Sequence, residues 1–202
     1  MRIVFHIDDL GKKLYYNNMD RWVQFARFAE FETEHLRMRP FHFSDGQDFF
    51  EIASNPQNLV FLFSACSSRA ESDYLMVHSF MKNPLGAWAL EDKDSHKMIG
   101  VIRFENLKEK ASEAEIGYFI NQNFWGRGLA TEALQNLVFL SFQEFAFERL
   151  SLIVHQENHA SGRVAEKAGF RLSKRFKGSD RYSHKIRDYL AYDYQIGDWN
   201  NE

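Results

Sequence analysis

One junction, where a strand turns directly into a long helix, constrains the fold of this 202-residue chain more than any other feature. Residues 113–120 (EAEIGYFI) alternate at first and are then wholly apolar, a pattern that is typical of a strand. Apolar residues at helical spacing follow over 129–145 and predict a long helix. Gly126 and Gly128 lie between the two, and glycine adopts backbone angles that other residues avoid. We therefore expect a tight turn from sheet to helix at this point.

The remaining segments predict a sheet interleaved with several helices. Residues 86–90 and 98–104 are apolar runs separated by the polar EDKDSHK, which is the layout of an antiparallel hairpin. Ser44 and Asp45 are candidate caps of a helix, and Gly169 is placed to end another. Further strands are expected at 35–43, 150–154, 170–176 and 189–194, and helices at 47–53, 69–81 and 158–167. This order of elements predicts a mixed α/β or α+β sheet.

A composition shift near Phe31 divides the chain into two parts. The first part contains a short strand-like IVFHI and a segment, 15–30, whose apolar residues recur at helical spacing. We interpret residues 1–30 as an N-terminal appendage that serves packing or dimer formation, because its polar residues show no clustered chemistry. Residues 31–202 then form the main domain, since a chain of this length usually makes one domain.

Composition and charge exclude several classes of function. Lys and Arg total 25 against 28 Asp and Glu, a net charge of −3, whereas domains that bind nucleic acid are usually strongly basic. No apolar stretch approaches the ~20 residues of a membrane span, and the first residues lack the layout of a signal peptide, so we expect a soluble cytoplasmic protein. The single cysteine, Cys66, excludes an internal disulfide. His155 and His159 form no convincing ligand pair, and no metal is expected.

The start of the predicted long helix is a candidate anion site. Unpaired backbone N–H groups and the positive end of the helix dipole favour a phosphate or pyrophosphate there, and Arg127 could add a charge-assisted hydrogen bond. The Gly-Lys-Ser or Gly-Lys-Thr of a nucleoside-triphosphate loop is missing. A dinucleotide-binding fingerprint is weak, because Thr131 replaces the third small residue and Glu148 precedes a strand instead of ending it. A plain tight turn with two glycines remains the structural alternative.

Two longer stretches resemble one known family. AEIGYFINQNFWGRGLATEAL and VHQENHASGRVAEKAGF are similar to the acetyl-CoA-dependent GNAT N-acetyltransferases, and within them to the branch that acetylates ribosomal-protein N-termini. The likeness extends from about Phe31 to Tyr194 and includes FETEHLRMRPF, GAWALEDKDSHKMIG and IRDYLAYDY. It implies a single domain with a mixed, mostly antiparallel central sheet that is splayed between two strands and covered by helices on both faces.

The resemblance also implies that acetyl-CoA is the cosubstrate. In the family, backbone amides of the glycine loop hold the coenzyme A pyrophosphate, and Asn123 stands where the family has Gln or Arg. Trp125 is a family feature that we interpret as a core or loop anchor. The candidate cofactor-binding residues are Phe119, Ile120, Asn123, Phe124, Trp125, Gly126, Arg127, Gly128, Leu129, Ala130, Asn158 and Ser161.

The implied reaction is direct attack of an amine on the thioester, with no covalent enzyme intermediate. It needs a neutral amine, a stabilised oxyanion and a proton for the departing thiolate. In the family the pantetheine arm lies between two splayed strands, which here would end at Ile120 and Val154. A backbone N–H near Phe119 or Ile120 would then face the thioester oxygen.

The resemblance also suggests which side chains move protons. Glu115 is the candidate base, although strand alternation alone would also expose a carboxylate there. Asn158 is a pantetheine ligand, an ordinary helix N-cap, or both. Many relatives carry a tyrosine that acts as the general acid where this chain has Ala165. The role of general acid therefore passes to Ser161. Alternatively, Ser161 only supports Asn158 in the first turn of the helix. Asp188 either lines the acceptor site or positions its strand.

The sequence thus predicts an acetyl-CoA:amine N-acetyltransferase that makes no use of nucleic acid or a membrane. The acceptor is left open between a protein N-terminus and a small amine such as a polyamine, an aminoglycoside or an amino-acid derivative. A homodimer is compatible with the appendage. The alternative from another class is a non-catalytic module that binds acyl-CoA and senses it, which Ala165 favours slightly.

Overall fold

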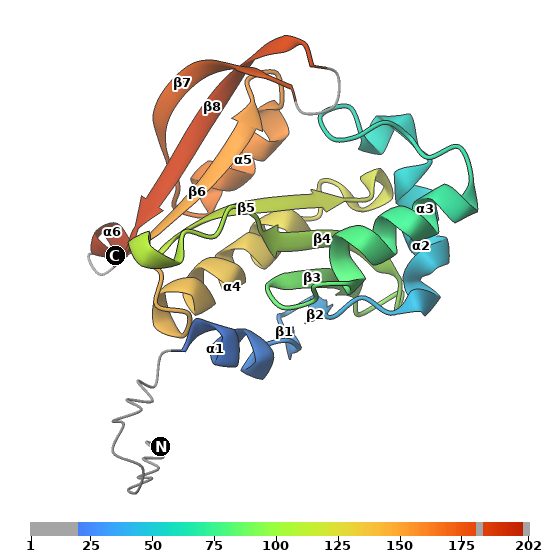
Figure 1. The fold of residues 1–202 in the computed structure, drawn as a ribbon, viewed down its shortest axis with the longest axis horizontal. Coiled ribbons are helices and arrows are strands. Elements are labelled where there is room, and N and C mark those ends of the chain that lie inside the picture. Colours follow the sequence, from blue (N-terminus) through green and yellow to red (C-terminus); the bar gives the residue numbers. More distant parts are fainter. Residues whose placement is uncertain (1–19, 181–183, 200–202) are drawn as a thin grey trace, which may run out of the picture.

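The computed structural model describes residues 20–180 and 184–199, which fold around one eight-stranded sheet (Figure 1). The strand order is β1-β2-β3-β4-β5-β6-β8-β7, and every neighbouring pair is antiparallel except β5 and β6. The strands are β1 Phe31–Glu32, β2 Leu36–Arg39, β3 Ala87–Asp92, β4 Met98–Phe104, β5 Glu113–Ile120, β6 Arg149–His155, β7 Arg171–Ser179 and β8 Ile186–Gln195. The helices are α1 Arg21–Arg27, α2 Gly46–Ala53, α3 Arg69–Met76, α4 Leu129–Gln143, α5 His159–Lys167 and α6 Ile196–Trp199.

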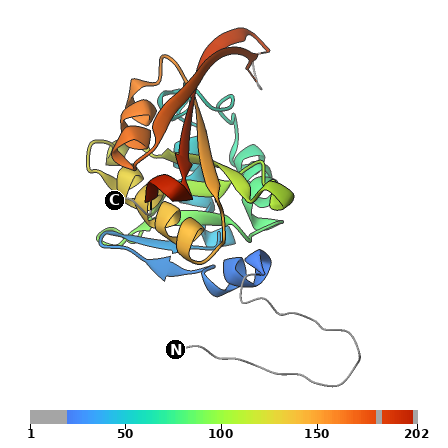
Figure 2. The ribbon, with the colours of Figure 1, turned by 90° about the vertical axis from the view of Figure 1, so that its left-hand side faces the viewer.

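Helices cover both faces of the sheet, which confirms the predicted fold class. Helices α2 and α3 bury Phe49, Ile52 and Met76 against the outward residues of β3 and β4. Helices α4 and α5 cover the opposite face, where the larger hydrophobic cluster also includes Trp88 and Phe145. In the turned view the β7–β8 hairpin extends beyond the rest of the sheet (Figure 2).

The two parallel strands at the centre, β5 and β6, pair only where they begin. Their register joins Glu113 to Arg149, Ala114 to Leu150 and Glu115 to Ser151, and no pair follows. Strand β5 continues beside β4, whereas β6 continues beside β8, so the two strands diverge (Figure 1). The predicted splay between two strands is therefore confirmed.

The local predictions are confirmed where residues close in sequence determine the element. Strand β5 has the predicted bounds, and β3 and β4 form the predicted hairpin. Helix α3 continues through a π-helical turn, Val77–Met81, and so covers the predicted 69–81. Helix α5 is followed by Gly169 at φ +93°, the left-handed conformation expected after a helix.

Two predictions about the region before α2 were wrong. The strand expected over 35–43 ends at Arg39, because Pro40 has no N–H to continue a ladder. Asp45 does stand at the N-cap position of α2, but neither its side chain nor that of Ser44 makes the expected capping hydrogen bond. Instead the buried Asp45 carboxylate accepts hydrogen bonds of 2.8 Å from Arg39 and from the backbone N–H of His42.

The predicted appendage lies partly outside the described residues, since the IVFHI segment and all residues before Asp20 are not described. In the described part, Asp20 caps α1 by accepting from the backbone N–H groups of Trp22 and Val23. Helix α1 ends at Arg27, earlier than the expected Glu30. Phe25 is fully buried in the larger cluster, so α1 contributes directly to the core of the main domain. Dimer formation stays a prediction.

Within the described ranges, no helix is long and apolar enough to cross a membrane.

We expect Phe25→Ala to lower the free energy of unfolding by about 3–5 kcal/mol, because it removes a buried ring that packs against Phe104 and Phe145. Val23→Ala on the exposed side of the same helix is the matched control and should change stability by less than about 0.5 kcal/mol. Urea unfolding of the two variants measures the difference. Equal effects would show that α1 is not part of the cooperative core.

Candidate active site

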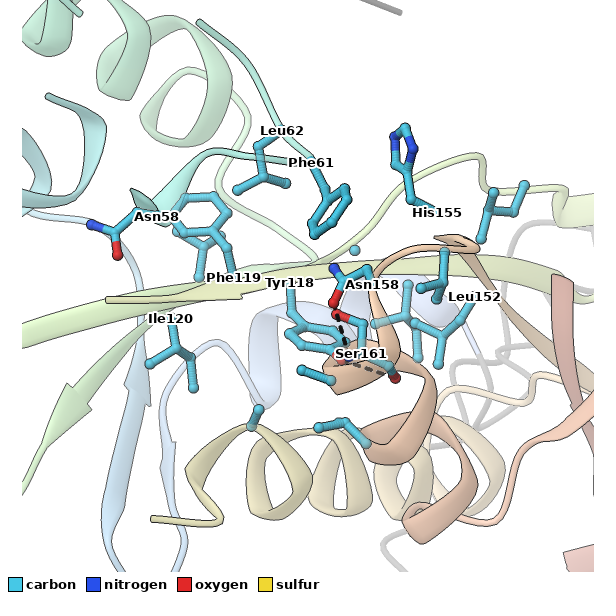
Figure 3. Close-up of a pocket in the computed structure, with 18 of the residues that line it drawn as sticks. Asn58, Phe61, Leu62, Tyr118, Phe119, Ile120, Leu152, His155, Asn158 and Ser161 are labelled. Carbon is cyan, nitrogen blue, oxygen red and sulfur yellow. Dashed lines mark hydrogen bonds between the residues drawn. The ribbon is translucent and has the colours of Figure 1, made fainter. Parts of the chain in front are cut away.

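The divergence of β5 and β6 opens a cavity of about 1060 Å³ (Figure 3). Its walls come from β5, from β6 and the start of α5, from the loop that follows β5, and from an apolar segment at 57–63. A space of this size accommodates a ligand with a long flexible arm. Gly126, Gly128, Leu129 and Ala130 of the predicted cofactor loop line it, together with Phe124 and Trp125.

The loop between β5 and α4 is held in one conformation by backbone geometry and by an indole. Gly126 and Gly128 have φ values of +76° and +83°, which favour glycine. A Cβ added at either position would meet no protein atom within 4 Å, so the need for glycine comes from the backbone angle and not from crowding. The Trp125 indole N–H donates a 2.7 Å hydrogen bond to the Ile120 carbonyl. Trp125 is therefore the loop anchor that the sequence suggested.

A continuous set of backbone donors follows this turn. Among the described residues, none of the backbone N–H groups from Gly126 to Thr131 has a hydrogen-bond acceptor. The N–H groups on either side, of Trp125 and Glu132, do have one. Free donors at the start of a helix, together with its dipole, make an anion-binding site.

Asn123 faces away from this site. Its side-chain amide donates a 3.0 Å hydrogen bond to Glu51 of α2, and Asn121 donates to the same carboxylate oxygen at 2.8 Å. The hydrogen bond from Asn121, assisted by Lys97 and Asn123 against the opposing effect of burial, lowers the pKa of Glu51. Glu51 thus ties the loop to α2, and the side chain of Asn123 does not reach the cavity.

Arg127 also departs from its expected position. Its guanidinium lies 3.2 Å from the buried carboxylate of Asp92 and 5.3 Å from the ring of Phe124, and it does not line the cavity. Burial would raise the pKa of Asp92, but hydrogen bonds from Ser95 and the charge of Arg127 together lower it. Arg127 holds the loop against the β3–β4 turn.

Strand alternation decides which backbone N–H faces the opening between β5 and β6. The Asn121 N–H donates to Ile99 and the Glu115 carbonyl accepts from Glu105, so odd-numbered residues of β5 bond toward β4. Even-numbered residues of β5 direct their backbone N–H and C=O groups away from β4, toward the β6 side. Of the two predicted oxyanion donors, Ile120 is therefore aimed at the opening, whereas the Phe119 N–H is directed at β4.

The predicted base, Glu115, lines the wall of the cavity that faces α2 and α3. Its carboxylate accepts a 2.8 Å hydrogen bond from Asn106. A second carboxylate, Glu105, lies over Gly117, where an added Cβ would come within 2.7 Å of it, and it accepts from Arg103 at 3.0 Å. The sequence analysis missed Glu105, because only the pairing of β4 with β5 brings it beside the strand.

The other side of β5 faces α5. Asn158 caps this helix by accepting from the Ser161 N–H at 3.1 Å, which confirms the N-cap interpretation. Both side chains line the cavity. Tyr118 was also missed: its hydroxyl lies 3.5 Å from the Ser161 carbonyl, and burial raises the pKa of Tyr118 to about 12 (Figure 3). The signal was available, since alternation from the apolar Ala114 and Ile116 places Tyr118 on this face.

Asp188 and the two histidines considered in the sequence lie at different places relative to the cavity. Asp188 does not line the main cavity, and its backbone carbonyl accepts from the Gln156 N–H at 2.9 Å. His155 and His159 both line the cavity. Among the described residues, no group of three or more His, Cys, Asp or Glu side chains could hold a metal ion.

Comparison with known proteins identifies the family. The model of the acetyltransferase (GNAT) domain matches residues 35–171, more than half of the chain. The chain belongs to the GNAT acetyltransferase family. This confirms the resemblance and the predicted class of enzyme, an acyltransferase.

The relatives of this GNAT chain include proteins of the predicted branch. A Bacillus subtilis protein, "uncharacterized N-acetyltransferase YoaA", is 29% identical over 147 residues, which cover 71% of this chain and 83% of its own. The Escherichia coli ribosomal-protein-serine acetyltransferase is 31% identical over 96 residues, 48% of this chain and 54% of its own. The fold is similar to that of the microcin C7 self-immunity acetyltransferase MccE, solved with acetyl-CoA and AMP, with a TM-score of 0.72 and 19% identity over 81% of this chain and 94% of that one.

We expect Glu51→Ala to speed amide hydrogen exchange in residues 121–126 by about tenfold or more, because it removes the hydrogen bonds from Asn121 and Asn123 to a charged acceptor. Glu71→Ala on α3, which removes contacts to Ser67 alone, is the matched control. Hydrogen exchange followed by mass spectrometry reports each segment. Unchanged exchange in the Glu51 variant would mean that the loop holds its conformation without α2.

Proposed function

We propose that this protein transfers the acetyl group of acetyl-CoA to a primary amine by direct attack. One observation carries the proposal: free backbone donors from Gly126 to Thr131 lie at the mouth of a cavity between two diverging strands. The donors suit the diphosphate of coenzyme A, and the separated strands leave room for its pantetheine arm. MccE, which has a similar fold, was solved with acetyl-CoA bound.

In this arrangement the chain supplies binding and orientation. Backbone donors of the glycine loop hold the diphosphate, and the side-chain amide of Asn158, whose oxygen caps α5, remains available to the pantetheine amides. The Ile120 N–H, aimed between the strands, would stabilise the oxyanion that forms on the thioester carbon. Asn123 and Arg127 act indirectly, since they hold the loop against α2 and against the β3–β4 turn.

Proton transfer is assigned to both sides of β5. Glu115, held by Asn106, accepts a proton from the amine directly or through water. On the opposite side, Ser161 is the candidate donor to the departing thiolate, and the Tyr118 hydroxyl beside it is a second one. Because burial raises the pKa of Tyr118 to about 12, this hydroxyl stays protonated at neutral pH and can donate.

The acceptor is proposed to be the N-terminus of a protein. The support comes from the Escherichia coli relative, whose name gives it as a ribosomal-protein-serine acetyltransferase. A small amine suits the same chemistry, and an acyl-CoA-binding module without activity remains the alternative from another class. Release of free thiol from acetyl-CoA, measured with a panel of peptides and small amines, separates these possibilities. Tight binding of acetyl-CoA with no transfer to any amine would support the module.

We expect Gly128→Val to remove measurable binding of acetyl-CoA. A β-branched residue is strained at φ +83°, and relief of that strain would turn the neighbouring N–H groups away from the diphosphate. Isothermal calorimetry measures the affinity. Gly128→Asn is the control, because asparagine tolerates the left-handed region and should keep most of the affinity. Wild-type affinity in the Val variant would contradict the assignment of the loop.

We expect Glu115→Gln to slow acetyl transfer by about 10²- to 10⁴-fold at pH 7 and to recover part of the rate at high pH. The amide keeps the contact with Asn106 but cannot accept a proton, whereas at high pH unprotonated amine and hydroxide replace the carboxylate. Initial rates between pH 6 and pH 10 test this. A rate profile identical to that of the wild type would remove Glu115 from the mechanism.

A further inference from the structure

A histidine lines the same cavity as Glu115. His155 is the last residue of β6, and it alternates with Leu152 and Val154, which are buried in the cluster beneath the sheet. Its side chain therefore points to the opposite face, the one that carries Glu115. Figure 3 shows His155 beside Phe61 on one side of β5, with Tyr118 and Ser161 on the other.

His155 is held in a defined position. Its Nε2 lies 3.4 Å from the carboxylate of Asp180, and the two side chains are only 14% and 13% exposed. The ring is enclosed between Phe61 and Tyr189, with centroids at 5.3 Å and 4.5 Å. Both His155 and Asp180 line the same cavity as Glu115.

The arrangement leaves one ring nitrogen free to exchange protons. A carboxylate beside Nε2 favours the tautomer that carries its proton there, which leaves Nδ1 as the basic atom. Nδ1 has no hydrogen-bond partner in the described part of the chain. The other charged or titratable groups near the ring are Asp180 and Tyr189, with Glu157, Arg187 and Asp188 around a small hollow beside it. The apolar segment at 57–63 contributes none.

We infer that His155, positioned by Asp180, takes the first proton from the acceptor's ammonium group as the amine enters the cavity. The inference rests on the proposed acetyl transfer and extends it. The α-ammonium group of a peptide loses its proton at about pH 8, an alkylammonium group at about pH 10, an imidazole at about pH 6.5 and a carboxylic acid at about pH 4. An imidazole is therefore better matched than a carboxylate as the base for this step, above all for a peptide N-terminus. His155 would act as a catalytic residue, because it exchanges a proton with the substrate, and Asp180 as a positioning residue that acts through His155.

The proton count requires two acceptors on the amine side. The ammonium loses one proton to Nδ1 of His155, and the imidazolium passes it to water. The neutral nitrogen attacks the thioester carbon, a bond between nitrogen and carbon forms, and the bond between carbon and sulfur breaks. The nitrogen gives up its second proton to Glu115, and the thiolate leaves as a thiol with a proton from Ser161 or Tyr118. Glu115 then releases its proton to solvent and the donor hydroxyl takes one up from solvent, which restores both groups. The products are an amide, free coenzyme A and one proton.

The test compares His155→Gln and Asp180→Asn with the wild-type chain. Thiol release from acetyl-CoA is followed from pH 6 to pH 10 with three acceptor probes: a hexapeptide that begins with serine, one that begins with alanine, and 1,4-diaminobutane. The only cysteine, Cys66, is buried, so the protein itself adds little thiol background. His96→Gln, in the exposed turn between β3 and β4, is the matched control and should behave as the wild type.

We expect His155→Gln to lower kcat/KM by about 10²- to 10⁴-fold at pH 7, to recover at high pH, and to keep wild-type affinity for acetyl-CoA in calorimetry. In the wild type, kcat/KM should fall on the acid side of neutrality. Asp180→Asn should lower kcat/KM at pH 7 and keep the affinity for acetyl-CoA, because the imidazole is no longer held in one orientation. Nitrogen chemical shifts of the His155 ring should show one tautomer in the wild type and a mixture in Asp180→Asn, a readout that needs no acceptor.

If His155→Gln keeps the pH profile of the wild type, the inference about His155 is wrong and the proposed acetyl transfer still stands. A single tautomer in Asp180→Asn overturns the positioning role of Asp180. If the wild type binds acetyl-CoA and acetylates none of the probes at any pH, the proposed function and the inference both fail. Loss of acetyl-CoA affinity in His155→Gln would indicate a disturbed fold, and it contradicts the expected result as well.

Discussion

The separation of β5 from β6 after three residue pairs is the constraint on which the rest of the structure depends. Each strand keeps a complete ladder on its outer side, with β4 and with β8, so the sheet remains continuous in its topology. Between them, backbone groups that would pair in an unbroken sheet are left to face a cavity. Buried backbone groups without partners are costly, and a strand pair that opens in this way is poised to bind a ligand with its own amides. The pantetheine arm of acetyl-CoA has that chemistry.

The loop at the end of β5 is held in its conformation by contacts within the protein. The indole of Trp125, the carboxylate of Glu51 and the ion pair of Arg127 with Asp92 hold it from three directions. The positive φ angles of Gly126 and Gly128 complete this conformation and leave the backbone N–H groups at the start of α4 without acceptors among the described residues. The side chains of Asn123 and Arg127 therefore hold the shape of the loop, and we propose that its backbone N–H groups bind the ligand.

The elements that were predicted correctly from the sequence are those determined by residues that lie close together in the sequence. Strand β5, the turn at Gly126 and Gly128, and the N-cap at Asn158 all follow from residues within a few positions of one another. Side-chain partners from distant segments could not be predicted in the same way. The predicted phosphate role of Arg127 did not account for Asp92, since the pair meets only once β3 and α4 are in place.

The candidate site was predictable to the same extent. Gly126, Gly128 and Glu115 line the cavity and were singled out from the sequence, because they lie in one continuous motif. Glu105 and the pair of His155 with Asp180 were not, because they come together through strand pairing and through the β7–β8 hairpin. Tyr118 could have been predicted, because the alternation of β5 places it on the same face as Ala114 and Ile116.

The carboxylate of Glu51 has a consequence for anyone who redesigns this enzyme. It projects from α2, yet its partners Asn121 and Asn123 belong to the turn that we propose binds the diphosphate of the acyl donor. A library of α2 variants made to broaden the range of accepted amines would therefore also change the affinity for the acyl donor. Keeping Glu51 fixed while its neighbours vary separates the two properties.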